Sequence, residues 1–154
     1  MSVVKQFKQI RIIFFAILLG LLLFCAGAVM LVHVRGAVMP LTPTQMQYIE
    51  TLIIILAFVG IPTAHYYHKK KTDHINAGLD GADKLARYRV SFFIKMATFE
   101  GVSLVSLLTY VMSGNNTFLI IFGILIVTIL INYPTKSRIS DELGTDEIDI
   151  FESK

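Results

Sequence analysis

The sequence predicts an all-α integral membrane protein, a four-helix bundle built from two helical hairpins with both termini in the cytoplasm. Three observations support this fold class. Of the 154 residues, 55% are apolar and only 16% are charged, whereas a soluble domain carries about a quarter charged residues. Four apolar runs are each close to the length that crosses a bilayer. Lysine and arginine alternate between abundant and scarce in the segments that flank these runs.

The four apolar runs follow one another within residues 1–133, the predicted transmembrane domain. The first covers residues 12–32 without a charge, and about 20 apolar residues are enough to cross a hydrocarbon core of about 30 Å. The second covers residues 49–67, the third 90–112 and the fourth 117–133. The third is expected to begin as a helix in the cytoplasm, before its apolar part.

A cleaved signal peptide is the alternative interpretation of the first run. Lys5, Lys8 and Arg11 form a basic segment before it, and the small residues 26–28 resemble a cleavage site. The apolar run is longer than that of a typical signal peptide and continues past this site to Val32. An uncleaved membrane anchor is therefore the favoured interpretation.

The distribution of lysine and arginine predicts the orientation. Basic residues are frequent before the first span, in residues 68–89 and after the fourth span, whereas residues 33–50 contain only Arg35 and residues 113–116 contain none. Because cytoplasmic loops carry the excess of basic residues, both termini and the middle loop are expected in the cytoplasm. The net charge of +3 is attributed to this orientation, and no nucleic-acid partner is expected.

Glu100 is the candidate functional residue inside the membrane. It lies ten residues, or about 15 Å, beyond the start of the third span, near the bilayer centre. A charged carboxylate there is costly, so it is expected to be protonated, paired or facing a wet cavity. One interpretation is a carboxylate that titrates or binds a cation. The other is a neutral glutamic acid that hydrogen-bonds a neighbouring helix and serves only assembly.

Two further polar residues of the third span complete this candidate set. Ser103 lies about one turn from Glu100. Lys95 lies nearer the cytoplasmic boundary, and its ammonium is expected to reach the interface along its own helix. Because five residues separate Lys95 from Glu100, a direct pair between them within the helix is not expected.

Small residues mark the faces where helices are expected to pack closely. They are Ala16, Gly20 and Gly27 in the first span, Gly60 in the second, and Ala97 and Gly101 in the third.

Several chemistries find no support in the sequence. Cys25 is the single cysteine, which excludes an intrachain disulfide or a thiol redox pair. His65, His68 and His74 have spacing that a metal could use, but neither cysteine nor a dense carboxylate set accompanies them. They are therefore assigned to the membrane interface. No nucleotide-binding loop or catalytic set is present, so no enzyme activity, metal or cofactor is predicted.

Residues 134–154 form the predicted cytoplasmic tail, which is acidic and carries apolar residues between its carboxylates. Two interpretations stay open. The tail is either solvated along its length, or it contains a small element that docks on the basic middle loop or on a partner.

Three motifs carry a resemblance to a known group of proteins. They are Met96-Ala97-Thr98-Phe99-Glu100-Gly101, the later Asn115, and Pro134-Thr135-Lys136 with Glu142-Leu143. This half of the chain resembles small four-span proteins of the bacterial inner (cytoplasmic) membrane that have no assigned function, and the resemblance implies that location but no activity. A weaker resemblance is to the proteolipids of rotary ATPases, although those carry the buried carboxylate in the second helix of a hairpin rather than the first.

Two functions from different classes are consistent with these observations. The favoured one is an assembly or accessory subunit that binds other membrane proteins, for which Glu100→Gln should be tolerated. The other is a small proton-coupled transporter or channel subunit acting as a homo-oligomer, because four helices enclose little space. It predicts that Glu100→Gln abolishes transport while leaving folding intact.

Overall fold

The computed structural model describes residues 3–39, 41–76, 78–146 and 150–151. Part of the predicted acidic tail, residues 147–149 and 152–154, lies outside the described residues. The described chain is all-helical, as predicted. Its helices are α1 (Val3–Arg35), α2 (Pro43–Asp73), α3 (Gly81–Ser113), α4 (Thr117–Ile131) and α5 (Lys136–Leu143).

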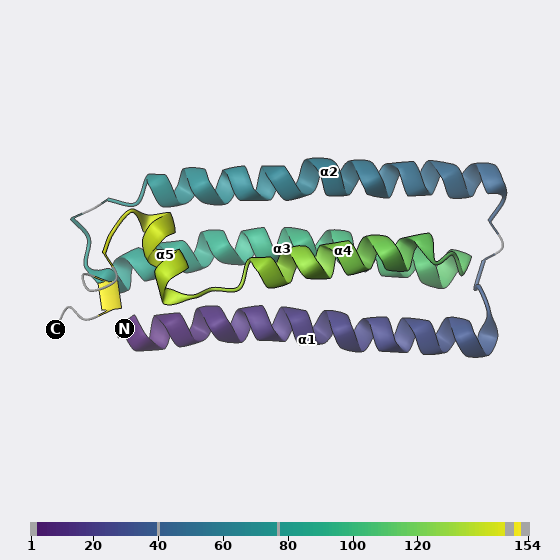
Figure 1. The fold of residues 1–154 in the computed structure, drawn as a ribbon, viewed down its shortest axis with the longest axis horizontal. Coiled ribbons are helices and arrows are strands. Elements are labelled where there is room, and N and C mark those ends of the chain that lie inside the picture. The colour runs from purple at the N-terminus through teal and green to yellow at the C-terminus, as the bar shows by residue number, and fades with distance from the viewer. Residues whose placement is uncertain (1–2, 40, 77, 147–149, 152–154) are drawn as a thin grey trace.

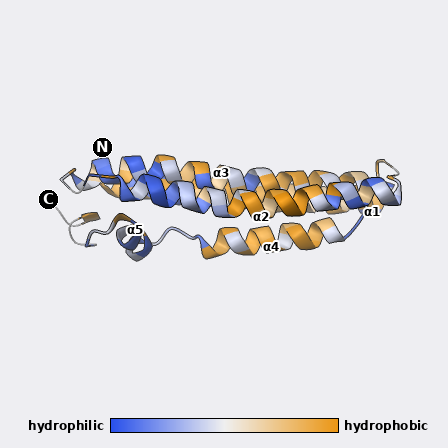
Figure 2. Cartoon of the chain, turned by 90° about the horizontal axis from the view of Figure 1, so that it is seen from above, coloured by the Kyte–Doolittle hydropathy of each residue, from blue (hydrophilic) through white to orange (hydrophobic). Residues whose placement is uncertain are grey.

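Helices α1 to α4 lie along one long axis, and each runs in the opposite direction to the one before it (Figure 1). Helix α3 is central, because it packs against α1, α2 and α4 and has the most buried residues of the described helices. Seen from above relative to Figure 1, α1, α2 and α3 form one layer and α4 lies on one side of it (Figure 2). The core is apolar and includes Phe14, Phe92 and Phe99, each at most 1% exposed.

Three helices, α1, α2 and α3, are each long and apolar enough to cross a membrane. Helix α4 differs from the predicted fourth span. It has 15 residues and is about 22 Å long, so it falls short of a full crossing by itself. Helices α4 and α5 pass the same test only together, and they are bent by 81° relative to each other. The bend follows from Pro134, which lacks a backbone N–H and cannot continue the helix.

The polar residues gather at one end of the bundle. Figure 2 shows hydrophilic colouring at the end where the N-terminus and α5 lie, and apolar colouring along the middle of the helices. The connection between α2 and α3 lies at this same end (Figure 1). Both helices extend past the predicted spans at this end: α2 continues from residue 67 to Asp73, and α3 begins at Gly81 rather than at residue 90. This end is called the polar end below.

The predicted packing residues have different surroundings. A Cβ on Gly60 would lie 3.6 Å from Val102 Cγ2 of α3, so Gly60 does lie at a contact between two helices. A Cβ on Gly20, Gly27 or Gly101 would meet nothing within 4 Å, and Ala16 is exposed. These residues are on the outer surface and do not bring helices of this one chain together.

Candidate functional site

The candidate site depends on how α5 is placed at the polar end. After Pro134, Thr135 caps α5, because its hydroxyl accepts a hydrogen bond from the Arg138 backbone N–H at 3.2 Å. Gly144 ends the helix in the left-handed conformation, with φ of 59°, which glycine adopts without steric cost. Two local signals therefore define an eight-residue helix that leaves the axis of the bundle.

One apolar side chain anchors α5. Ile139 is fully buried in the same core cluster as Phe92 and Met96. The polar face of α5 contacts α2. Further along, a Cβ on Gly81 would lie only 2.6 Å from the Ile150 carbonyl oxygen, so the tail also passes tightly over the start of α3. The docked interpretation of the tail therefore fits its described parts, α5 and Ile150, because both contact the helical bundle.

Docking brings Glu142 of α5 into a cluster of hydrogen-bond donors from three helices. Its Oε2 accepts a hydrogen bond from the Tyr88 hydroxyl at 2.6 Å and lies 2.9 Å from His68 Nε2. Its Oε1 accepts one from Arg138 Nε at 3.3 Å and lies 3.9 Å from Lys95 Nζ. These five residues are called the Glu142 cluster below.

Lys95 lies elsewhere than the sequence predicts. Its side chain does not extend to the interface: the residue is only 1% exposed. The ammonium lies near the Glu142 carboxylate and 5.4 Å from the centre of the Phe92 ring. The physical reason is that α5 folds back over the polar end. It covers Lys95 and supplies a carboxylate there, so the charge is paired without reaching water.

His68 connects the cluster to a second polar chain. Its Nδ1 lies 2.9 Å from Ser91 Oγ, and the Ser91 hydroxyl donates to the Tyr88 carbonyl oxygen at 2.9 Å. If Ser91 donates to that carbonyl, Nδ1 must carry a proton and donate to Ser91. Because Nε2 donates to the Glu142 carboxylate, His68 is then an imidazolium. If Ser91 turns to donate to Nδ1, His68 is neutral. One hydroxyl rotation thus accommodates either charge state.

Burial and the neighbouring charges together shift the pKa values of three groups that lie beyond the predicted spans. Burial alone would raise the pKa of Glu142, but the His68 hydrogen bond, the Lys95 charge and the Tyr88 hydrogen bond outweigh it and hold the pKa at about 2. Burial lowers the pKa of His68, although Glu142 opposes this change. Burial and then the Glu142 charge raise the pKa of Tyr88, so its hydroxyl stays a donor. Glu142 is therefore the fixed negative charge of the cluster at neutral pH.

The structure does not unite the residues that the sequence singles out in the third span. Glu100 is partly exposed, and it forms no hydrogen bond or ion pair with the described residues. Ser103 is buried, and its hydroxyl donates to the Phe99 carbonyl of its own helix at 2.8 Å. Lys95 belongs to the Glu142 cluster instead. The five-position offset from Lys95 to Glu100 places the two side chains about 140° apart around α3.

Sequence reasoning missed most of the cluster. It placed His68 at the interface, and it gave no role to Tyr88, Ser91 or Arg138. One signal was available in the tail, where Arg138 and Glu142 are four residues apart and Ile139 and Leu143 share a face. Among the described residues, no group of three or more histidine, cysteine, aspartate or glutamate side chains is arranged to hold a metal.

Comparison with known proteins adds no relative. The chain matches no protein-family model, and no curated protein and no solved structure is significantly similar to it.

Proposed function

We propose that this protein is an accessory subunit of a membrane complex and binds another membrane protein through the face of α3 that carries Glu100. The observation that carries the proposal is the exposure of Glu100 near the middle of a helix that can span the membrane. A carboxyl group facing hydrocarbon without a hydrogen-bond partner is costly even when it is protonated. A contact with a second protein removes that cost.

The surroundings of Glu100 on α3 suit a close helix contact. Ala97, Gly101 and Leu108 recur at spacings of four and seven residues, so they lie on one face. Leu108 is 51% exposed, and Gly101 is also exposed. Glu100 is three residues from Ala97, at the edge of this face. Small residues allow two backbones to approach, and a polar side chain beside them can hydrogen-bond across the contact.

The proposed setting is a bacterial inner membrane, with the polar end in the cytoplasm. Three long apolar helices support insertion in a membrane. The basic residues support the orientation, because the polar end carries Lys5, Lys8 and the lysines at 69–71. In this arrangement α4 is the fourth membrane element, and its bend into α5 returns the chain to the cytoplasmic surface.

A small proton-coupled transporter is the second candidate, and one observation favours it. Glu142 and His68 border a surface hollow of about 280 Å³, which Asp73 and Asp141 also line. Protons could reach the Glu142 cluster from this hollow. On this hypothesis the protein acts as a homo-oligomer, and Glu100→Gln abolishes transport while folding is kept.

Photo-crosslinking from defined faces of the bundle tests the accessory role. A photoreactive residue placed at Leu108 of α3 should crosslink to one second protein in the native membrane. The matched control is the same residue at Ile124 of α4, which is 61% exposed on another helix and should give no such product. A product only with a second copy of this chain, or equal products from both positions, would count against the proposed face.

Substitution of Glu100 separates the two candidates. Glu100→Gln keeps a hydrogen-bonding side chain of the same size, so an accessory subunit should keep its partner, whereas a proton carrier should lose transport. Glu100→Leu removes the hydrogen bond and should reduce the Leu108 crosslink. An unchanged crosslink in Glu100→Leu would show that Glu100 is not part of the contact.

A further inference from the structure

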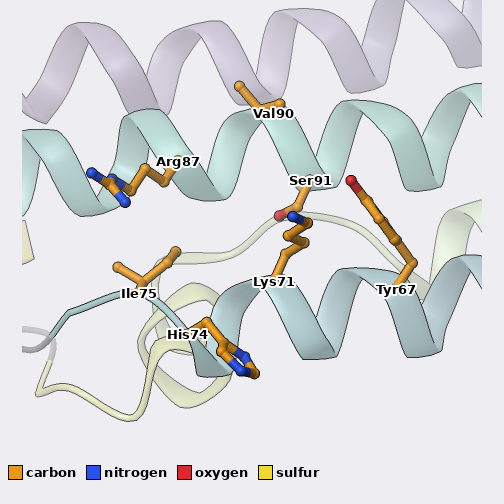
Figure 3. A pocket seen from close by; sticks show the side chains of 7 residues that line it. All are labelled: Tyr67, Lys71, His74, Ile75, Arg87, Val90 and Ser91. Atoms are coloured by element: carbon orange, nitrogen blue, oxygen red, sulfur yellow. The ribbon is translucent and has the colours of Figure 1, made fainter.

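The described surface contains a basic groove between α2 and α3 that the Glu142 cluster does not use. It has a volume of about 380 Å³ and lies near the connection between α2 and α3, at the polar end; Figure 3 shows its lining side chains. Its lining consists of Tyr67, Lys71, His74, Ile75, Arg87, Val90 and Ser91. An adjoining hollow shares Tyr67, Lys71 and His74 with it and adds Lys70.

The charges of the groove are unbalanced. Lys71 extends from α2 toward Ser91 on α3, and Arg87 lies on the same side of α3 (Figure 3). Neither the groove nor the adjoining hollow has an aspartate or glutamate among its lining residues. Within the described residues, the salt bridges involve neither Lys71 nor Arg87. Both side chains are cations, so an anion that enters the groove meets positive charge from two helices and no carboxylate among the lining residues.

The position of the groove along the helices indicates where that anion comes from. Tyr67 is the last residue of the second predicted span, and Val90 is the first residue of the third. The groove therefore begins where the apolar parts of two helices end, at the depth of the lipid headgroups. Lys71 Nζ lies 5.6 Å from the centre of the Tyr67 ring, a cation–π contact that holds the ammonium at this level. Val90 is 57% exposed and offers an apolar surface beside the cations.

We propose that this groove binds the phosphate of an anionic phospholipid headgroup, with Lys71 and Arg87 as its principal ligands. Arginine pairs with phosphate through its planar fork of N–H donors, and lysine acts as a point charge beside it. The acyl chains then lie along Val90 and the apolar surface below it.

Native mass spectrometry of the full chain in detergent tests the assignment. The probes are phosphatidylglycerol, phosphatidylcholine and inorganic phosphate. Phosphatidylglycerol should bind more tightly than phosphatidylcholine. The double variant Lys71→Gln/Arg87→Gln should lose about twenty-five-fold in phosphatidylglycerol affinity, because each basic residue near the membrane surface contributes about fivefold.

Two control variants keep the test independent of folding and of total charge. Lys8→Gln/Lys69→Gln removes the same charge from residues outside the lining and should change the affinity less than threefold. Lys71→Arg/Arg87→Lys keeps the charge in the groove and should keep most of the affinity. Equal losses in the groove variant and in Lys8→Gln/Lys69→Gln would overturn the proposal.

The inorganic phosphate arm decides the source of the anion. Millimolar phosphate should not displace phosphatidylglycerol, because the free ion lacks the acyl chains that contact the apolar surface. Displacement that depends on Lys71 and Arg87 would show that the groove takes a free phosphate and would overturn its assignment to a lipid.

Discussion

Neutralising Glu142 should release α5 from the bundle. The Glu142→Gln substitution removes the negative charge that faces Lys95, Arg138 and His68, while an amide oxygen can still accept the Tyr88 hydroxyl. The positively charged groups then lie near one another without a counter-charge. Helix α5 has only eight residues and is marginal without this docking. Undocking is therefore expected to unfold it.

The size of the effect follows from the pKa of Glu142. A fall from the ordinary value of 4.5 to about 2 corresponds to roughly 3 kcal/mol of stabilisation of the docked state at neutral pH. The side chain is 26% exposed, so solvent screens part of this interaction. We expect a loss of about 2 kcal/mol, which raises the undocked population about thirtyfold.

Hydrogen–deuterium exchange of the backbone amides of α5, followed by mass spectrometry, measures this population. In Glu142→Gln these amides should exchange about thirtyfold faster, while the central turns of α3 keep their protection. Asp141→Asn is the matched control, because Asp141 is the adjacent exposed carboxylate and is not part of the cluster. Equal exchange in the wild type and Glu142→Gln, or equal acceleration in both variants, would refute the electrostatic account of docking.

Three further predictions concern the same end of the bundle. Glu142 has a lowered pKa in the folded state, so its stabilisation is complete above about pH 4.5 and is lost as the pH falls toward about 2. The protection of the α5 amides against exchange, corrected for the intrinsic pH dependence of exchange, should fall across this window, and constant protection would contradict it. Ile139→Ala should lower the free energy of α5 docking by about 2–4 kcal/mol, because Ile139 is fully buried, and Ile139→Val should lower it by about 1 kcal/mol. Amide exchange in α5 measures both losses, and equal losses would contradict burial as the cause. Gly81→Ala should displace the tail, because the added Cβ would lie 2.6 Å from the Ile150 carbonyl oxygen. Limited proteolysis should then cut the chain after Gly144, while circular dichroism shows an unchanged helix content. A tail that resists cleavage would contradict the contact.

The long helices were predictable because their signal is local. Runs of apolar residues without charge define α1 and α2, and neither depends on contacts with distant parts of the chain. Helix α4 ends at Ile131, two residues before the predicted end of the fourth span at 133, because Asn132 caps α4 and Pro134 turns the chain, and hydropathy registers neither.

The Glu142 cluster was not predictable because its members meet only after the chain turns. His68 and Glu142 are 74 residues apart, and Tyr88 and Glu142 are 54 apart. The 81° bend between α4 and α5 decides whether they come together, and no local pattern specifies such an angle. Lys95 was misplaced for the same reason: its side chain was expected to reach the interface because Lys95 lies near the cytoplasmic boundary, whereas the carboxylate beside it comes from α5.

The outward position of the small residues changes their interpretation. Gly20 and Gly101 are small residues of the kind that occur at helix contacts. Outside their own stretch of helix, however, no atom of the described chain lies within 4 Å of a Cβ at either position. Sequence spacing shows that a face can be approached closely, and it does not show which helix approaches it. A second protein at this face is the central claim of the proposed function.

The most direct test is the native mass and composition of the complex, extracted gently from its own membrane. We predict one defined second protein at a fixed stoichiometry, kept in Glu100→Gln and reduced in Glu100→Leu. A homo-oligomer whose mass and composition are the same in all three forms would contradict the accessory role and direct the next assays to transport.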